Sequence, residues 1–144
     1  MGTPLVNLMN FLIYLIITAP LMGAGLWIFL KITPYKEFEI IGQGGGDNPA
    51  RAASSIAAAL VLGGKVFALA IVISSAIFHS VSPVDLMIWG MVGIVFQLAI
   101  YYIYELTTPF KVADEIPKGN ISVGILSAFL SLATGVILAA LISY

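Results

Sequence analysis

The class of this protein can be recognised from residues 50–78, which read ARAASSIAAALVLGGKVFALAIVISSAIF. A transmembrane helix needs about 20 predominantly apolar residues to cross a hydrocarbon core about 30 Å thick. Within this stretch, the only charged residue after Arg51 is Lys65. Three further apolar stretches, at residues 5–30, 84–106 and 120–143, also meet the length requirement. The alternation of a membrane β-barrel is missing, so helices are the expected spanning form.

The overall composition points to the same class. Of the 144 residues, 60% are hydrophobic and 9% are charged, and the mean hydropathy is +1.08. A soluble domain carries about 25% charged residues, so a freely soluble protein is excluded. The formal net charge of −1 comes without a basic stripe, and nucleic acid is therefore not an expected partner. With no cysteine and one histidine, we expect neither a metal site nor a cofactor.

The positive charges predict how the chain is oriented. The first apolar stretch has no Lys or Arg before Leu5 and continues to Leu30, which is too long for a signal peptide, so we interpret it as a retained span. Basic residues lie in or beside the first and third connections only: Lys31, Lys36, Arg51, Lys111 and Lys118. The positive-inside rule places these two connections in the cytoplasm and both termini on the opposite side of the membrane, which is the periplasm if the membrane is a bacterial inner membrane.

An internal repeat organises the chain. Thr33-Pro34-Tyr35-Lys36 recurs as Thr108-Pro109-Phe110-Lys111, and each copy is followed by a helix start with an asparagine at the cap position, Asn48 and Asn120. Both prolines are expected to end the preceding helix. Two copies with an even number of spans insert the same way up. We therefore predict an all-α membrane four-helix bundle, a single transmembrane domain built from two parallel two-helix repeats at residues 1–79 and 80–144.

The spans differ in side-chain size. Spans one and three carry aromatic and bulky residues, whereas spans two and four carry small ones, which let helix backbones approach closely in lipid. We expect spans two and four to form the packed interior or a subunit interface. The packing positions predicted for them are Gly63, Gly64, Gly124, Ala128 and Gly135. Residues 35–41 alternate polar and apolar side chains, which is typical of a segment lying on the membrane surface.

Lys65 is the leading candidate for an intramembrane site. It follows Arg51 by about 21 Å of helix, which places it near the middle of the membrane. A charge there costs from about 3 to more than 10 kcal/mol, so Lys65 is expected to face a wet cavity or a partner. Two interpretations stay open. The lysine either lines a pore or relays protons, or it packs the bundle by bonding to Gln97, Thr134 or nearby carbonyl groups.

The other polar candidates favour structural roles. Gln97 is suited to a hydrogen bond between helices, and Glu105 to pairing with Lys111 or Lys31 rather than to ion binding. His79 and Asp85 are interpreted as solvated loop residues, with a pH-sensitive pair as the alternative. Neither a complete catalytic constellation nor a phosphate-binding loop is present, since the glycines of residues 42–46 precede no Lys-Ser/Thr pair. We therefore expect no catalytic residues and no enzyme.

The order of several short motifs resembles a known family. They are Ile32-Thr33-Pro34 with Glu37, Asn48 leading into an Ala-rich helix, Ser74-Ser75-Ala76-Ile77, and Trp89-Gly90 with Gln97. Together they are similar to the family called domain of unknown function 350, the YjfL-like small bacterial inner-membrane proteins. The resemblance covers nearly the whole chain and implies a four-span inner-membrane protein with duplicated halves, but no reaction. The Gly-rich first loop and Lys65 depart from the pattern, so a role of Lys65 need not be shared.

From these observations we expect a non-enzymatic structural or assembly subunit of a bacterial inner-membrane complex. Its partners would be the lipid bilayer, further copies of itself that associate through the small-residue faces, and other subunits of the complex. The alternative is a small channel or transport subunit with Lys65 near an intramembrane path. A single copy has too few helices to enclose such a path, so several copies would be needed.

Overall fold

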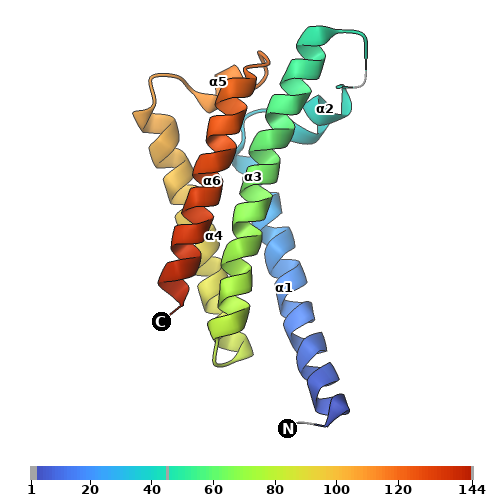
Figure 1. Ribbon diagram of the computed structural model, residues 1–144, viewed down its shortest axis with the longest axis vertical. Helices are drawn as coiled ribbons and strands as arrows, with labels where there is room; N and C mark the ends of the chain where they lie inside the picture. Colours follow the sequence, from blue (N-terminus) through green and yellow to red (C-terminus); the bar gives the residue numbers. More distant parts are fainter. Residues whose placement is uncertain (1–2, 45, 144) are drawn as a thin grey trace.

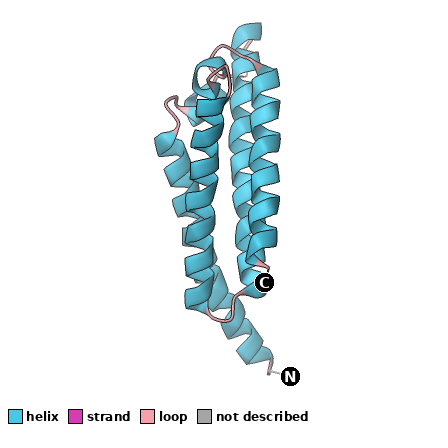
Figure 2. Cartoon of the chain, turned by 90° about the vertical axis from the view of Figure 1, so that its left-hand side faces the viewer, coloured by secondary structure: helices cyan, strands magenta, loops and turns pink. Residues whose placement is uncertain are grey.

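The computed structural model describes residues 3–44 and 46–143, and over these ranges all regular structure is helical (Figures 1 and 2). Four long helices cross the bundle: α1 (Pro4–Ile32), α3 (Pro49–His79), α4 (Pro83–Thr107) and α6 (Ile121–Ile142). Two short helices connect them, α2 (Glu37–Gly42) and α5 (Val112–Glu115). All four long helices are apolar and long enough to span a membrane, which confirms the predicted fold class.

The long helices run in two opposite directions. Helices α1 and α4 run towards the end of the bundle that carries α2 and α5, and α3 and α6 run away from it (Figure 1). The start of α1, the end of α6 and the turn between α3 and α4 therefore lie at the other end. The order long helix, short helix, long helix occurs twice along the chain. Whether the halves arose by duplication stays a prediction, as do the sidedness of the ends and the proposed domain limits.

The Thr-Pro motifs lie where α1 and α4 end. Thr33 and Thr108 have extended backbone conformations, which the following Pro34 and Pro109 favour. Each threonine satisfies a carbonyl group of the last helical turn with both its N–H and its hydroxyl group. The next long helices begin with asparagine caps: Asn48 accepts hydrogen bonds from the N–H groups of residues 50 and 51, and Asn120 from that of residue 123. Gly45 of the glycine-rich loop lies outside the described residues.

Helices α3 and α6 form the most extensive contact in the bundle. Glycines on either helix face alanines on the other along a seam with three contact points: Ala57 with Gly124, Gly64 with Ala128, and Ala68 with Gly135. A Cβ atom added at residue 64 would lie 2.6 Å from the Cα atom of its alanine, and one added at residue 135 would lie 2.7 Å from a carbonyl oxygen. The small faces of the two helices are thus used within one chain.

Gly63 was predicted to pack in the interior or at a subunit interface, and within one chain it takes no part in the α3–α6 seam. A Cβ atom at this position would meet no atom within 4 Å. One residue step turns an α-helix by about 100°, so the neighbour of a seam residue points away from the seam. Of the paired glycines at residues 63 and 64, only the second packs against α6.

The first half of α1 has the least contact with the rest of the bundle. Only three of the 29 residues of α1 are buried, compared with 12 of the 31 residues of α3. Large apolar side chains of its first half are well exposed, among them Leu5, Met9, Phe11 and Ile16. Within a bilayer this surface faces lipid or another protein.

Candidate functional site

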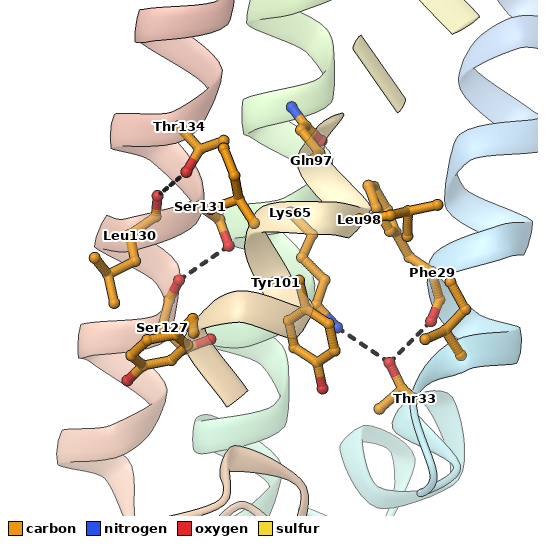
Figure 3. A pocket seen from close by; sticks show the side chains of 13 residues that line it. Phe29, Thr33, Lys65, Gln97, Leu98, Tyr101, Ser127, Leu130, Ser131 and Thr134 are labelled. Atoms are coloured by element: carbon orange, nitrogen blue, oxygen red, sulfur yellow. Dashed lines mark hydrogen bonds between the residues drawn. The ribbon is translucent and has the colours of Figure 1, made fainter. Parts of the chain in front are cut away.

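Lys65 forms a buried ion pair with Glu37. The lysine Nζ atom lies 3.3 Å from Glu37 Oε1. It also donates a hydrogen bond of 3.0 Å to Thr33 Oγ1, which Figure 3 shows. It lies 4.6 Å from the centre of the Tyr101 ring, a distance typical of a cation–π contact. Lys65 is 5% exposed and Glu37 is 2% exposed. The charge of the lysine is therefore compensated by groups from α1, α2 and α4.

The end of α1 brings Glu37 to this position. The chain leaves α1 at Thr33, is held extended by Pro34, and starts α2 at Glu37. Thr33 Oγ1 lies 2.8 Å from the carbonyl oxygen of Phe29 and 3.2 Å from Glu37 Oε1. Because the hydroxyl group accepts from Lys65 and has one hydrogen, it donates to one of these two oxygens at a time. The threonine thus connects the end of α1 with both charges of the ion pair.

The site is shallower in the bundle than the sequence predicted. Gly64, next to Lys65, packs against Ala128, which follows the first residue of α6 by about 10 Å of helix. Tyr101 likewise lies about 9 Å before the end of α4. Helix α3 begins beyond the other helices at this end, so counting from Arg51 overestimates the depth (Figure 1). Measured along α6, the level of Lys65 lies about one third of the length of this 22-residue helix from the α2 and α5 end.

A cavity of about 30 Å³ borders the ion pair. It has room for about two water molecules. Its lining combines apolar side chains with hydroxyl and amide groups from four helices: Phe29, Ile32, Thr33, Lys65, Gln97, Leu98, Ile100, Tyr101, Tyr104, Ser127, Leu130, Ser131 and Thr134. The hydroxyl groups of Ser131 and Thr134 donate to carbonyl oxygens one turn earlier on α6, as Figure 3 shows, so their oxygens can still accept hydrogen bonds.

Several polar atoms around the site have no partner in the described part of the chain. They are Glu37 Oε2, the hydroxyl groups of Tyr35 and Tyr104, and Gln97 Nε2. Burial, and then the nearby charge of Glu37, raise the pKa of Tyr35 well above its ordinary value of 10.0, so this hydroxyl group stays protonated. Buried polar groups almost always have a partner, either protein or water. These atoms therefore indicate a hydrated site.

The partners of Lys65 differ from those expected from the sequence. Gln97 and Thr134 line the same cavity, but neither is hydrogen-bonded to the lysine, whose partners are Thr33 and Glu37. Glu37 was missed because residues 35–41 were interpreted as a surface segment. They contain a helical turn instead, in which Glu37 faces inward and Phe38 outward. The sequence signal that could have identified Glu37 as a site residue is its position three residues after Pro34 in the Thr33-Pro34 motif.

Glu105 has a local role at the end of α4. Its carboxylate accepts hydrogen bonds from the N–H groups of Val112 and Ala113, at the start of α5. The ion pairs expected with Lys111 and Lys31 are not among those that the described residues form. Its negative charge still lies close enough to interact electrostatically with Lys65.

The residues of the opposite turn do not form a site. His79 Nδ1 lies 2.9 Å from the carbonyl oxygen of Ser75, whereas Asp85 accepts a hydrogen bond from the N–H group of Val81. No ion pair joins the two side chains in the described ranges. A search of the same residues finds no group of three or more His, Cys, Asp or Glu side chains that could hold a metal ion.

The fold and this site define a small polytopic membrane protein with a buried ion pair between its helices. The chain belongs to the family described as Domain of Unknown Function (DUF350), whose model matches residues 3–142. This confirms the resemblance seen in the sequence motifs.

Two relatives show how far the similarity extends. The chain is 33% identical over 116 residues to the UPF0719 transmembrane protein YshE of Bacillus subtilis (strain 168), covering 80% of this chain and 79% of that protein. It is 28% identical over 138 residues to the UPF0719 inner membrane protein YjfL of Escherichia coli (strain K12), covering 96% of each. No solved structure matches the chain.

Proposed function

We propose that this chain is a non-enzymatic transport subunit of the bacterial inner membrane, and that the Lys65–Glu37 pair is the intramembrane site through which an ion passes. The observation that carries the proposal is a buried ion pair beside a polar cavity, with Lys65 in one of the four apolar spans and Glu37 on the short helix that follows another. Ionisable residues at such depth are costly, and they typically mark ion pathways in membrane proteins. Because the small-residue faces of α3 and α6 pack against each other within one chain, association of copies would use other apolar surfaces, such as the exposed first half of α1.

The cavity is open on one side of the bundle. Two of its lining residues, Ile100 on α4 and Leu130 on α6, are 36% and 37% exposed. The cavity therefore reaches the surface between these two helices. Deeper in the bundle, the interior is filled by the apolar side chains of two clusters, one that includes Leu21, Leu69 and Ile94 and one that includes Val72 and Leu138. One copy thus offers a wet site but no wet path across the membrane, and we propose that several copies together complete it.

Reconstitution tests this proposal directly. The purified chain is placed in lipid nanodiscs for native mass spectrometry and in liposomes for flux measurements with a voltage-sensitive dye. We expect a defined oligomer and a current that is lost in the double variant Lys65→Met/Glu37→Met. The matched control is the exposed ion pair of Lys36 and Glu39, replaced in the same way. A monomer without any ion current would overturn the proposal.

An assembly subunit is the second candidate, and a specific observation favours it. The first half of α1 exposes large apolar side chains and extends past the other helices (Figure 1). This surface would suit a neighbouring helix of another subunit. Co-purification from membranes, with and without α1 residues changed to alanine, would identify such a subunit. Unchanged co-purification would argue against this role for α1.

A further inference from the structure

We propose that the species handled at this site is the proton, which moves between Lys65 and Glu37 inside the membrane. This inference rests on the proposed transport function and names its substrate. The ammonium group donates to Glu37 Oε1 at 3.3 Å, and the hydroxyl group of Thr33 lies 3.0 Å from the lysine nitrogen and 3.2 Å from the same carboxylate oxygen. A direct and a hydroxyl-bridged route therefore join the two charges.

The proton step is balanced in atoms and in charge. When Lys65 Nζ releases a proton to Glu37 Oε1, the N–H bond breaks and an O–H bond forms, leaving a neutral amine and a neutral carboxylic acid. No other reactant is required. Since desolvation disfavours charged groups, the neutral pair and the ion pair are close alternatives in a buried site. Each member can then exchange its proton with a different side of the site.

The small cavity and the exchangeable groups beside it suit a proton. The space beside the pair is about 30 Å³, enough for about two water molecules. A proton needs only a line of hydrogen-bonding atoms, and the ammonium group of Lys65, the hydroxyl group of Thr33 and the carboxylate of Glu37 form such a line.

Unpartnered polar atoms extend such a line on both sides of the pair. Glu37 Oε2 and the hydroxyl group of Tyr35 belong to α2 and the segment before it, whereas the hydroxyl group of Tyr104 and Gln97 Nε2 belong to residues that line the cavity. Water bridging these atoms would satisfy them and connect the pair to the end of the bundle.

The titratable groups that interact with the pair come from two other segments. The segment before α2 contributes Tyr35, and α4 contributes Tyr101 and Glu105, while Tyr104 of α4 lines the cavity beside Lys65. Helix α6 lines the cavity with Ser127, Leu130, Ser131 and Thr134, none of which is titratable. Lys65 is therefore the single cation among these groups, and Glu37 is the carboxylate in direct contact with it.

The decisive experiment separates the role of charge from that of proton exchange. Liposomes containing the full chain and a pH-sensitive dye are given a potassium diffusion potential, and the proton uptake is recorded. Lys65→Arg keeps the positive charge beside Glu37, but a guanidinium group does not release its proton in proteins. Glu37→Gln keeps the shape of the side chain and removes its ability to carry a proton. We expect both variants to lose the proton uptake, down to the rate of protein-free liposomes.

The control is Glu39→Gln, which changes an exposed carboxylate on the same short helix and should leave the uptake unchanged. If Glu37→Gln fails to fold, Lys65→Arg alone decides, because the ion pair is retained. Normal proton uptake in Lys65→Arg would overturn the inference. A current carried by sodium, potassium or chloride without proton uptake would overturn the inference but leave the proposed transport function standing. The absence of any current would overturn both.

Discussion

Removing one member of the buried ion pair should cost far more than removing both. Lys65→Met leaves the carboxylate of Glu37 buried at 2% exposure, and Glu37→Met leaves the ammonium group at 5% exposure. Breaking a buried pair in this way typically costs about 3–5 kcal/mol, whereas replacing the whole pair by apolar groups of similar volume is often neutral or stabilising. Because the costs of the two single variants add and the double variant costs little, the double-mutant cycle should give a coupling free energy of at least about 6 kcal/mol.

The cycle is measured from the unfolding of the helices in mixed micelles, followed by circular dichroism as denaturing detergent is added. The exposed pair of Lys36 and Glu39 serves as the control, with an expected coupling of about 0–1 kcal/mol. Ordinary hydrogen bonds between membrane helices contribute about 0.6 kcal/mol on average. A coupling of only about 0.6 kcal/mol between Lys65 and Glu37 would contradict the claim that the two residues form a buried ion pair. A double variant less stable than either single variant would contradict it as well.

Three further outcomes can be checked independently. Gly64→Ala should lower the free energy of unfolding by about 1–3 kcal/mol, because the added Cβ atom meets the backbone of α6. Gly63→Ala adds a Cβ atom that meets no neighbouring atom, so it should be neutral or stabilising by up to about 1 kcal/mol. Thermal unfolding of the two variants compares them. The hydrogen bond from Lys118, and after it the one from Asn120, lower the pKa of the Glu115 carboxyl group. The Glu115–Lys118 pair therefore stabilises the fold at neutral pH, and this stabilisation is lost as the pH falls through the lowered pKa of Glu115. NMR titration of Glu115 with and without Lys118→Gln tests this, and identical titration curves would contradict it. Because the chain has no cysteine, Val81→Cys in the exposed turn provides a single labelling site. The predicted orientation places this turn outside, so an impermeant thiol reagent should label it in intact cells. Labelling only after permeabilisation would show the opposite orientation.

The packing of α3 against α6 and the turn after α1 together explain how Lys65 and Glu37 come to lie side by side inside the bundle. The close approach of α3 to α6 fixes the height of Lys65, and the Thr-Pro break fixes where Glu37 begins α2. If the pair handles protons, the rigid seam keeps one partner in place while the short helix α2 carries the other.

Much of this architecture follows from local sequence patterns. The four spans follow from the length of the apolar runs, because lipid satisfies no backbone group and only a helix can cross it alone. The helix ends follow from Pro34 and Pro109 and from the caps Asn48 and Asn120, since a missing N–H group and a side-chain acceptor act within a few residues. The sequence also predicted that the second and fourth spans, which form α3 and α6, carry mostly small residues.

The ion pair was decided by the tertiary structure alone. Its members are 28 residues apart in the chain, and no local pattern states that the turn after α1 folds back against the middle of α3. The depth of Lys65 depends on how far α3 extends beyond its neighbours, and the difference between Gly63 and Gly64 depends on which side of α3 meets α6. Local patterns act over a few residues through backbone geometry, whereas the pairing of distant charges depends on how whole helices are offset and rotated when they pack.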